Sequence, residues 1–217
     1  MFNSAISSKL KLAAAGLMFV CATANASVIT SLTGGTSITF PSVNLFTAGP
    51  VVESGYTYTS SYRNSVFGYT GGYGLYLNGG WDGGVGPYLG LNTGTGWSRI
   101  TFANPVASVL AFVNYSAAPG SGYDGSPASI AAYDASDNLI ESFTLSWSTS
   151  GQNQGFDYGF SESSAVIQSI QFNNAYIVAT DLRISEQGTS VPEPGSFVLL
   201  GLGLAGLGAM RRKQKAA

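Results

Sequence analysis

Runs in which apolar and polar residues alternate recur along the chain between residues 37 and 185. Alternation with a period of two places every second side chain on the same face, which is the pattern of a half-buried β-strand. In the run Leu139–Trp147, the side chains of Leu139, Phe143, Leu145 and Trp147 fall on one face. No segment after Ala26 and before Pro194 shows the 3.6-residue repeat of an amphipathic helix. The alternation therefore restricts the body of the chain to β structure.

Nine such runs are separated by stretches rich in glycine, serine and asparagine, the residues of turns. The segment Asp134–Asn138, between two of the runs, carries the residue types of a hairpin turn. The sequence therefore predicts an all-β domain, a β-sandwich of jelly-roll type. The nine predicted strands are Ser37–Phe40, Tyr56–Ser60, Ser98–Phe102, Ala107–Tyr115, Ser129–Tyr133, Leu139–Trp147, Phe156–Ser161, Ile167–Phe172 and Tyr176–Ser185.

Charge and reactive residues exclude several classes of function. Residues 27–190 contain three arginines, no lysine and ten carboxylates, a net charge of −7. Because nucleic-acid binding needs cations to neutralise phosphates, this acidic body argues against a nucleic-acid partner. The chain has no histidine, and its one cysteine is Cys21. Catalytic Ser-His-Asp and Cys-His arrangements and His-ligated metal sites are thereby excluded.

The N-terminus has the three parts of an export signal in the right order. Two lysines precede the apolar run Leu12–Ala22, and the small-x-small pattern of Ala24 and Ala26 follows it. Signal peptidase reads this pattern, so we expect a signal peptide over residues 1–26 and a cut before Ser27. The run of eleven residues is too short to span ~30 Å of hydrocarbon. The alternative is a buried N-terminal helix.

The C-terminus also has three parts. The tetrapeptide Val191-Pro192-Glu193-Pro194 is extended, because its prolines deny a helix its hydrogen bonds. The uncharged, glycine-rich stretch Phe197–Met210 follows, and it reaches seventeen residues when counted from Pro194. That is the short end of the ~17–25 residues that a transmembrane helix needs. The pair Arg211-Arg212 begins a basic tail, which places the tail in the cytoplasm by the positive-inside rule.

Together these three parts resemble a PEP-CTERM sorting signal. The resemblance covers residues 191–217 and rests on Val191-Pro192-Glu193-Pro194, the apolar helix and Arg211-Arg212 in register. It implies that an exosortase, a membrane-embedded transpeptidase of exopolysaccharide-producing Gram-negative bacteria, processes this chain. The protein would then be held in the inner membrane by its C-terminal helix and afterwards reach the cell surface or the extracellular matrix. The body, residues 27–190, is the expected ectodomain, and Ala107–Ser185 resembles the sandwich ectodomains common on such proteins.

Residues 68–96 differ from the rest of the body because they contain twelve glycines with aromatic residues between them. We expect long loops around one short strand, Leu75–Leu77. One interpretation is a carbohydrate-binding surface, in which flat aromatic faces stack on sugar rings. The alternative is ordinary loop packing, in which the rings cover the open edge of a core. The candidate carbohydrate-binding residues are Tyr73, Tyr76, Trp81 and Tyr88.

Carboxylates offer two further sites, neither with a defined set of residues. Aspartates in or near loops are ligands that calcium prefers, so a structural Ca²⁺ is an open alternative to having no cofactor. A pair of carboxylates is what a glycosidase needs, which leaves a small polysaccharide-active hydrolase as the second function. The first function is a non-catalytic surface or matrix protein that binds exopolysaccharide. The aspartates are Asp82, Asp124, Asp134, Asp137, Asp157 and Asp181, and the glutamates of the body are Glu53, Glu141, Glu162 and Glu186.

Overall fold

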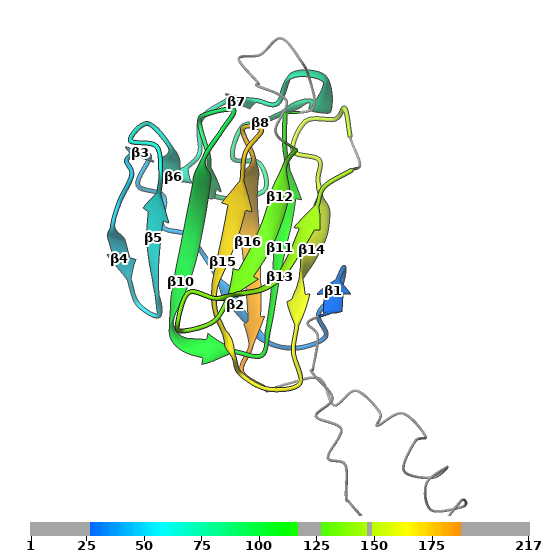
Figure 1. Ribbon diagram of the computed structural model, residues 1–217. Helices are drawn as coiled ribbons and strands as arrows, with labels where there is room; N and C mark the ends of the chain where they lie inside the picture. Colours follow the sequence, from blue (N-terminus) through cyan, green and yellow to red (C-terminus); the bar gives the residue numbers. More distant parts are fainter. Residues whose placement is uncertain (1–26, 117–126, 147–148, 188–217) are drawn as a thin grey trace, which may run out of the picture.

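A computed structural model describes residues 27–116, 127–146 and 149–187, and its last eight strands form a jelly roll (Figure 1). One sheet contains the order β14-β11-β16-β9 and the other contains β13-β12-β15-β10, with antiparallel neighbours throughout. The chain therefore changes sheet at every step from β9 to β16 except between β12 and β13, which are neighbours in the second sheet, and this is the winding of a jelly roll. These strands are β9 (Tyr88–Gly90), β10 (Trp97–Val106), β11 (Ser108–Asn114), β12 (Ser129–Tyr133), β13 (Leu139–Thr144), β14 (Phe156–Ser161), β15 (Ile167–Asn173) and β16 (Val178–Ser185).

The first part of the chain extends both sheets beyond this unit. Strands β6 and β3 continue the first sheet past β9, β1 pairs with β14 at its opposite edge, and β2 pairs with β16. Strands β5 and β4 continue the second sheet past β10. A separate hairpin joins β7 and β8. The bounds are β1 (Ser27–Ile29), β2 (Thr36–Ile38), β3 (Leu45–Phe46), β4 (Val51–Glu53), β5 (Tyr56–Ser60), β6 (Val66–Tyr69), β7 (Tyr73–Gly74) and β8 (Gly80–Trp81).

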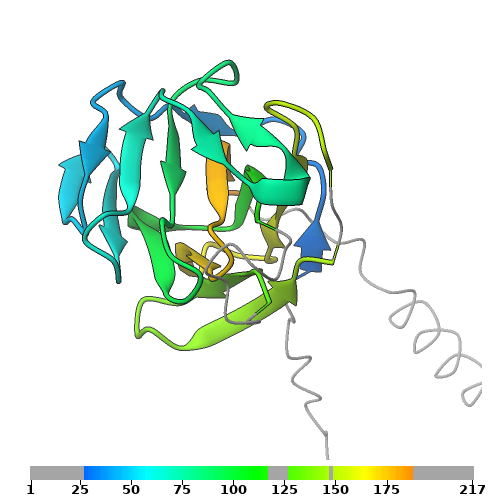
Figure 2. The ribbon, with the colours of Figure 1, turned by 90° about the horizontal axis from the view of Figure 1, so that it is seen from above.

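The two sheets lie in two layers (Figure 2), and the main core takes its side chains from both of them. Ile130 and Phe172 enter it from the second sheet, and Val109, Phe160 and Leu182 enter it from the first, all fully buried. Each belongs to a strand that the alternation predicts, because period-two strands present one apolar face to the opposite sheet. The all-β sandwich and its jelly-roll type are thus confirmed.

The predicted hairpin between β12 and β13 is present. The Asp134 carboxylate accepts hydrogen bonds from the backbone amides of Ser136 and Asn138, each 2.8 Å long. One detail of the predicted face is wrong, because Leu139 is 56% exposed. The register shifts between Ala132 and Tyr133 in the partner strand, so Ile140 packs against the core in place of Leu139.

Residues 68–96 form more structure than the sequence predicts. The expected strand Leu75–Leu77 is wrong, and a 3₁₀ turn, η1 (Tyr76–Asn78), occupies this position. Tyr76 has a φ of 54°, and the turn buries Leu75 while Leu77 stays 68% exposed. A strand would have placed both leucines on the same face.

Some strands of the structure were not among the nine predicted runs, and each of them has five residues or fewer. They are β1, β3, β4 and β6 to β9.

The described residues contain no helix long and apolar enough to cross a membrane. The predicted signal peptide and the predicted segment 191–217 lie outside the described residues.

Candidate functional site

A second, smaller core lies under the β7–β8 hairpin, apart from the jelly-roll core. The Trp81 ring stacks on Phe112 at 5.8 Å between centroids and meets the Tyr88 ring edge-on at 5.4 Å. The Trp81 indole N–H donates to the carbonyl of Gln154, and the Tyr88 hydroxyl donates to the carbonyl of Gly71. Only 1% of Trp81 and none of Tyr88 is exposed.

This burial corrects the candidate carbohydrate surface. Trp81 and Tyr88 offer no open ring face on which a sugar could stack, because neighbouring aromatic rings and backbone cover them. Both rings are therefore packed within a core, as the alternative interpretation, loop packing, predicts. The pKa of the Tyr88 hydroxyl lies well above its usual value, chiefly because burial disfavours the charged form and also because Tyr69 and Asp82 lie near.

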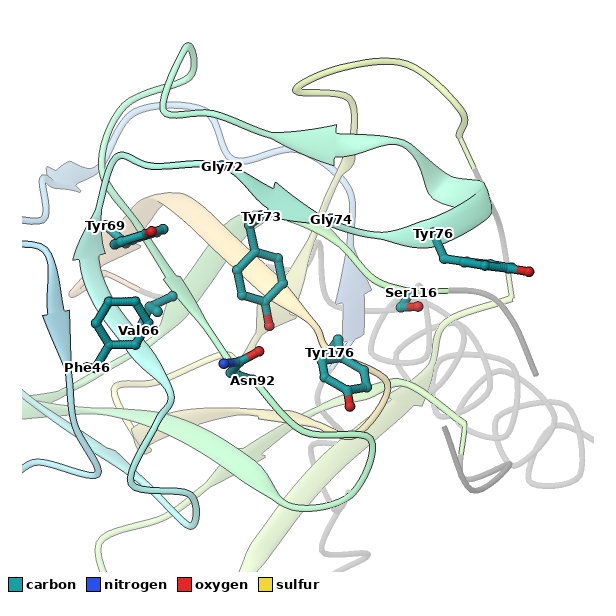
Figure 3. Close-up of a pocket in the computed structure, with 10 residues that line it drawn as sticks. All are labelled: Phe46, Val66, Tyr69, Gly72, Tyr73, Gly74, Tyr76, Asn92, Ser116 and Tyr176. Atoms are coloured by element: carbon teal, nitrogen blue, oxygen red, sulfur yellow. The ribbon is translucent and has the colours of Figure 1, made fainter. Parts of the chain in front are cut away.

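Beside this core lies a pocket of about 510 Å³ (Figure 3). Two of the candidate residues, Tyr73 and Tyr76, line it, and Tyr76 is 56% exposed. No residue in its lining is charged, as far as the described part of the chain extends. The lining residues are Phe46, Val66, Tyr69, Gly72, Tyr73, Gly74, Tyr76, Asn92, Ser116 and Tyr176.

The jelly roll positions three of these side chains by one row of paired residues. Val178 in β16 pairs with Gly90 of β9 on one side and with Asn114 of β11 on the other. Three chain segments extend from this row, and each brings a polar side chain to the pocket two residues beyond it. Asn92 follows Gly90, Ser116 follows Asn114, and Tyr176 precedes Val178.

A left-handed turn sets the direction of Tyr176. Residues Asn174, Ala175 and Tyr176 have successive φ values of 61°, 56° and 50°. Such a backbone costs roughly 1–2 kcal/mol per residue that is not glycine. Hydrogen bonds offset this cost, because the backbone amides of all three donate to carbonyls of the β9–β10 connection, at 2.9–3.1 Å. The predicted strand start at Tyr176 is therefore wrong, and this residue belongs to the pocket.

Polar groups of the pocket differ in how far the fold already uses them. The Tyr73 hydroxyl donates to the carbonyl of Leu91 at 2.8 Å, and burial raises its pKa well above the usual value. The side-chain amide of Asn92 and the hydroxyl of Tyr176 make no hydrogen bond within the described residues. An amide carries two donors and an acceptor, and a phenol carries one of each. The pocket therefore combines aromatic surface with uncharged groups that are able to bind hydroxyls.

Sequence reasoning located the segment that borders the pocket but missed most of its lining. Phe46, Tyr69, Asn92, Ser116 and Tyr176 come from five separate parts of the chain. Of these five, only Tyr69 and Asn92 lie within residues 68–96. The sequence signal for the left-handed turn before Tyr176 was Asn174-Ala175, because asparagine tolerates the left-handed region.

The aspartates proposed as calcium ligands are dispersed and engaged in other contacts. Asp82 accepts from the Asn153 amide at 2.6 Å, and this contact, with the Gly84 amide, lowers its pKa. Asp137 pairs with Arg99 at 2.6 Å, and Arg183 lies 3.2 Å from Asp157 and 3.7 Å from Asp181. Asp124 lies outside the described residues. Within the described ranges, no three carboxylates group into a metal site.

The glutamates considered for hydrolysis do not line the pocket either. Glu162 directly follows the last residue of β14, and Glu141 lies on β13. Burial, followed by the negative charge of Glu141, raises the pKa of Glu162. Both lie toward the end of the sandwich that carries Ser161 and Tyr133, away from the row of Gly90 and Asn114 that supports the pocket.

The processing residues lie at or beyond the borders of the described chain. Ser27, the expected first residue of the mature protein, is the first residue of β1. Ala24, Ala26, Val191-Pro192-Glu193-Pro194 and Arg211-Arg212 lie outside the described residues.

Comparison with known proteins identifies the C-terminal segment. Residues 190–213 match the family model of the PEP-CTERM protein-sorting motif, so this chain carries that motif. No curated protein matches the chain. Among solved structures it is similar to the F5/8 type C domain of a Bacteroides fragilis protein, with 18% identity and a TM-score of 0.33 over 63% of this chain and 95% of that one. It is also similar to the lectin domain of lectinolysin, solved with Lewis B antigen, with 8% identity and a TM-score of 0.28 over 76% and 94%.

Proposed function

We propose that this protein is an exosortase substrate, exported from a Gram-negative bacterium, that binds exopolysaccharide without cleaving it. The motif at residues 190–213 supports the processing half of the proposal. The observation that carries the binding half is the pocket, which is lined by the exposed Tyr76 and by the uncharged groups of Asn92 and Tyr176. A tyrosine face stacks on a pyranose ring, while amide and phenol groups hydrogen-bond its hydroxyls. The expected ligand is therefore a polysaccharide whose bound residues are neutral.

A hydrolase is the weaker candidate at this site. Glycosidases place two carboxylates around the bond that they cleave, roughly 5–10 Å apart. No carboxylate is among the residues described as lining the pocket. The absence of charge there favours retention of a glycan over its hydrolysis.

Binding is tested with exopolysaccharide purified from the producing bacterium. Tyr76→Ala and Asn92→Ala should each weaken binding about tenfold, which corresponds to ~1.4 kcal/mol. The melting temperature should hardly change, because Tyr76 is exposed and Asn92 makes no hydrogen bond with described residues. Tyr62→Ala is the matched control, since Tyr62 is also partly exposed but does not line the pocket. Unchanged binding by both pocket variants, or reducing ends released over time, would contradict the proposal.

Processing is tested at the motif itself. The mature protein should end near Val191–Pro194 and lack Arg211-Arg212, because the membrane segment serves only until exosortase acts. Changing Pro192, Glu193 and Pro194 to alanine should leave the full-length form in the inner membrane. Mass spectrometry of the released and membrane fractions measures both outcomes. Peptides from Phe197–Met210 in the released form would show that the motif does not direct processing.

A further inference from the structure

Both ends of the described chain emerge at one end of the sandwich. Ser27 pairs with Ser161, which pairs with Ser108, which pairs in turn with Ser185. These four residues form a row across β1, β14, β11 and β16, here called the serine row. The described chain begins in this row and ends at Gln187, two residues past it. The paths toward the signal peptide and toward the sorting motif therefore both start here.

The pocket lies at the opposite end of the same sheet. Strand β16 connects the two ends, because it begins at Val178, in the row that supports the pocket, and finishes at Ser185. Seven residue steps at ~3.3 Å separate the two rows by roughly 23 Å. Figure 1 shows the β7–β8 hairpin, which borders the pocket, at the end of the sandwich away from the last residues of β16.

We infer that the sandwich is a connector with two different ends: the chain is attached to the membrane at the serine row, and the pocket at the opposite end holds glycan. This inference rests on the proposed function, because it takes residues 191–217 as the attachment and the pocket as the glycan site. Attachment of the domain to the membrane and binding of glycan in the pocket are then compatible. The protein can link polysaccharide to the membrane before exosortase acts, and its pocket still points away from the attached end afterwards.

The length of the connecting chain supports this arrangement. From Gln187 to Val191 there are four residue steps, which span at most ~14 Å when fully extended. When an enzyme in the membrane holds Val191–Pro194, the serine row is thus the part of the domain closest to the bilayer. The pocket, ~23 Å further along β16, is beyond the reach of that short segment.

The first test uses the full-length chain, with its signal removed, in phosphatidylcholine liposomes. Beads coated with the producing bacterium's exopolysaccharide should capture these liposomes as well as they capture the detergent-solubilised protein. The double variant Tyr76→Ala/Asn92→Ala should abolish capture in both forms. Capture of the solubilised protein alone would overturn the connector, whereas capture of neither form would overturn the proposed binding function.

The second test measures orientation without any glycan, so it decides the connector even if binding fails. The body has no cysteine, and Cys21 lies in the expected signal, so single cysteines are easily labelled. Ser164→Cys marks the serine-row end, at an exposed residue of the β14–β15 connection, and Thr95→Cys marks the pocket end, at the exposed residue of the β9–β10 connection. Energy transfer to a headgroup-labelled lipid should be clearly stronger from position 164. Equal transfer, or stronger transfer from position 95, would overturn the inference.

Discussion

The jelly-roll strands β10–β16 and the glycine-rich segment 68–96 both bury aromatic side chains, but the sequence specifies the two regions differently. In the jelly roll, most strands have five residues or more, and alternation along each strand defines its buried face. No strand that lies wholly within residues 68–96 exceeds three residues, and burial there follows ring-to-ring packing around Trp81 and Tyr88. A period-two pattern can be recognised only in a strand that is several residues long. The comparison shows that an aromatic-glycine segment can form a true core without any periodic signal.

The largest effects should come from removing one large side chain from each core. Phe172→Ala empties part of the jelly-roll core, and Trp81→Ala does the same in the second core. Each should lower the free energy of unfolding by about 3–5 kcal/mol, since both side chains are fully or almost fully buried. Denaturant unfolding measures both losses.

The exposed neighbour Tyr76 supplies the control within the same segment, because Tyr76→Ala should change stability by less than about 0.5 kcal/mol. A loss from Trp81→Ala as small as that of Tyr76→Ala would break the comparison. Residues 68–96 would then be loosely packed loops, and Trp81 would return as a candidate for glycan stacking.

A smaller effect should distinguish the two regions by pH. In the jelly roll, burial and the charge of Glu141 raise the pKa of Glu162 above its ordinary value of 4.5. Its stabilising contribution is therefore complete below pH 4.5 and is lost as the pH rises through the folded pKa. Beside the second core, hydrogen bonds from Asn153 and Gly84 lower the pKa of Asp82 below 3.8, so its contribution is present above that pH and is lost in stronger acid.

Melting temperatures measured from pH 3 to pH 8 test both predicted pH dependences of stability. Glu162→Gln should raise the melting temperature at pH 7 relative to the wild type and leave it nearly unchanged at pH 4. Asp82→Asn should remove part of the loss that the wild type shows near pH 3. A Glu162→Gln variant that is less stable than the wild type at pH 7 would mean that the ionised carboxylate is stabilising.

The calcium and hydrolase alternatives show what residue type alone leaves undecided. Aspartate is both a calcium ligand and a turn former, and here Asp134 caps a hairpin while Asp137 pairs with Arg99. Sequence gives the inventory of carboxylates but not the distances between them. Those distances depend on which strands lie next to each other, and this is a property of the sheet order.

The sequence by itself determined seven of the eight jelly-roll strands, β10 to β16, and most of their inward faces, because alternation is a local property that survives in any tertiary setting. It also determined the sorting motif, whose parts are consecutive along the chain. Only the tertiary structure decided the pocket. Asn92, Ser116 and Tyr176 meet because β9, β11 and β16 pair side by side, and sheet order is not encoded in any one segment. The same packing decided that Trp81 and Tyr88 are buried while Tyr76 is exposed, since burial depends on what the rest of the chain places on top of each ring.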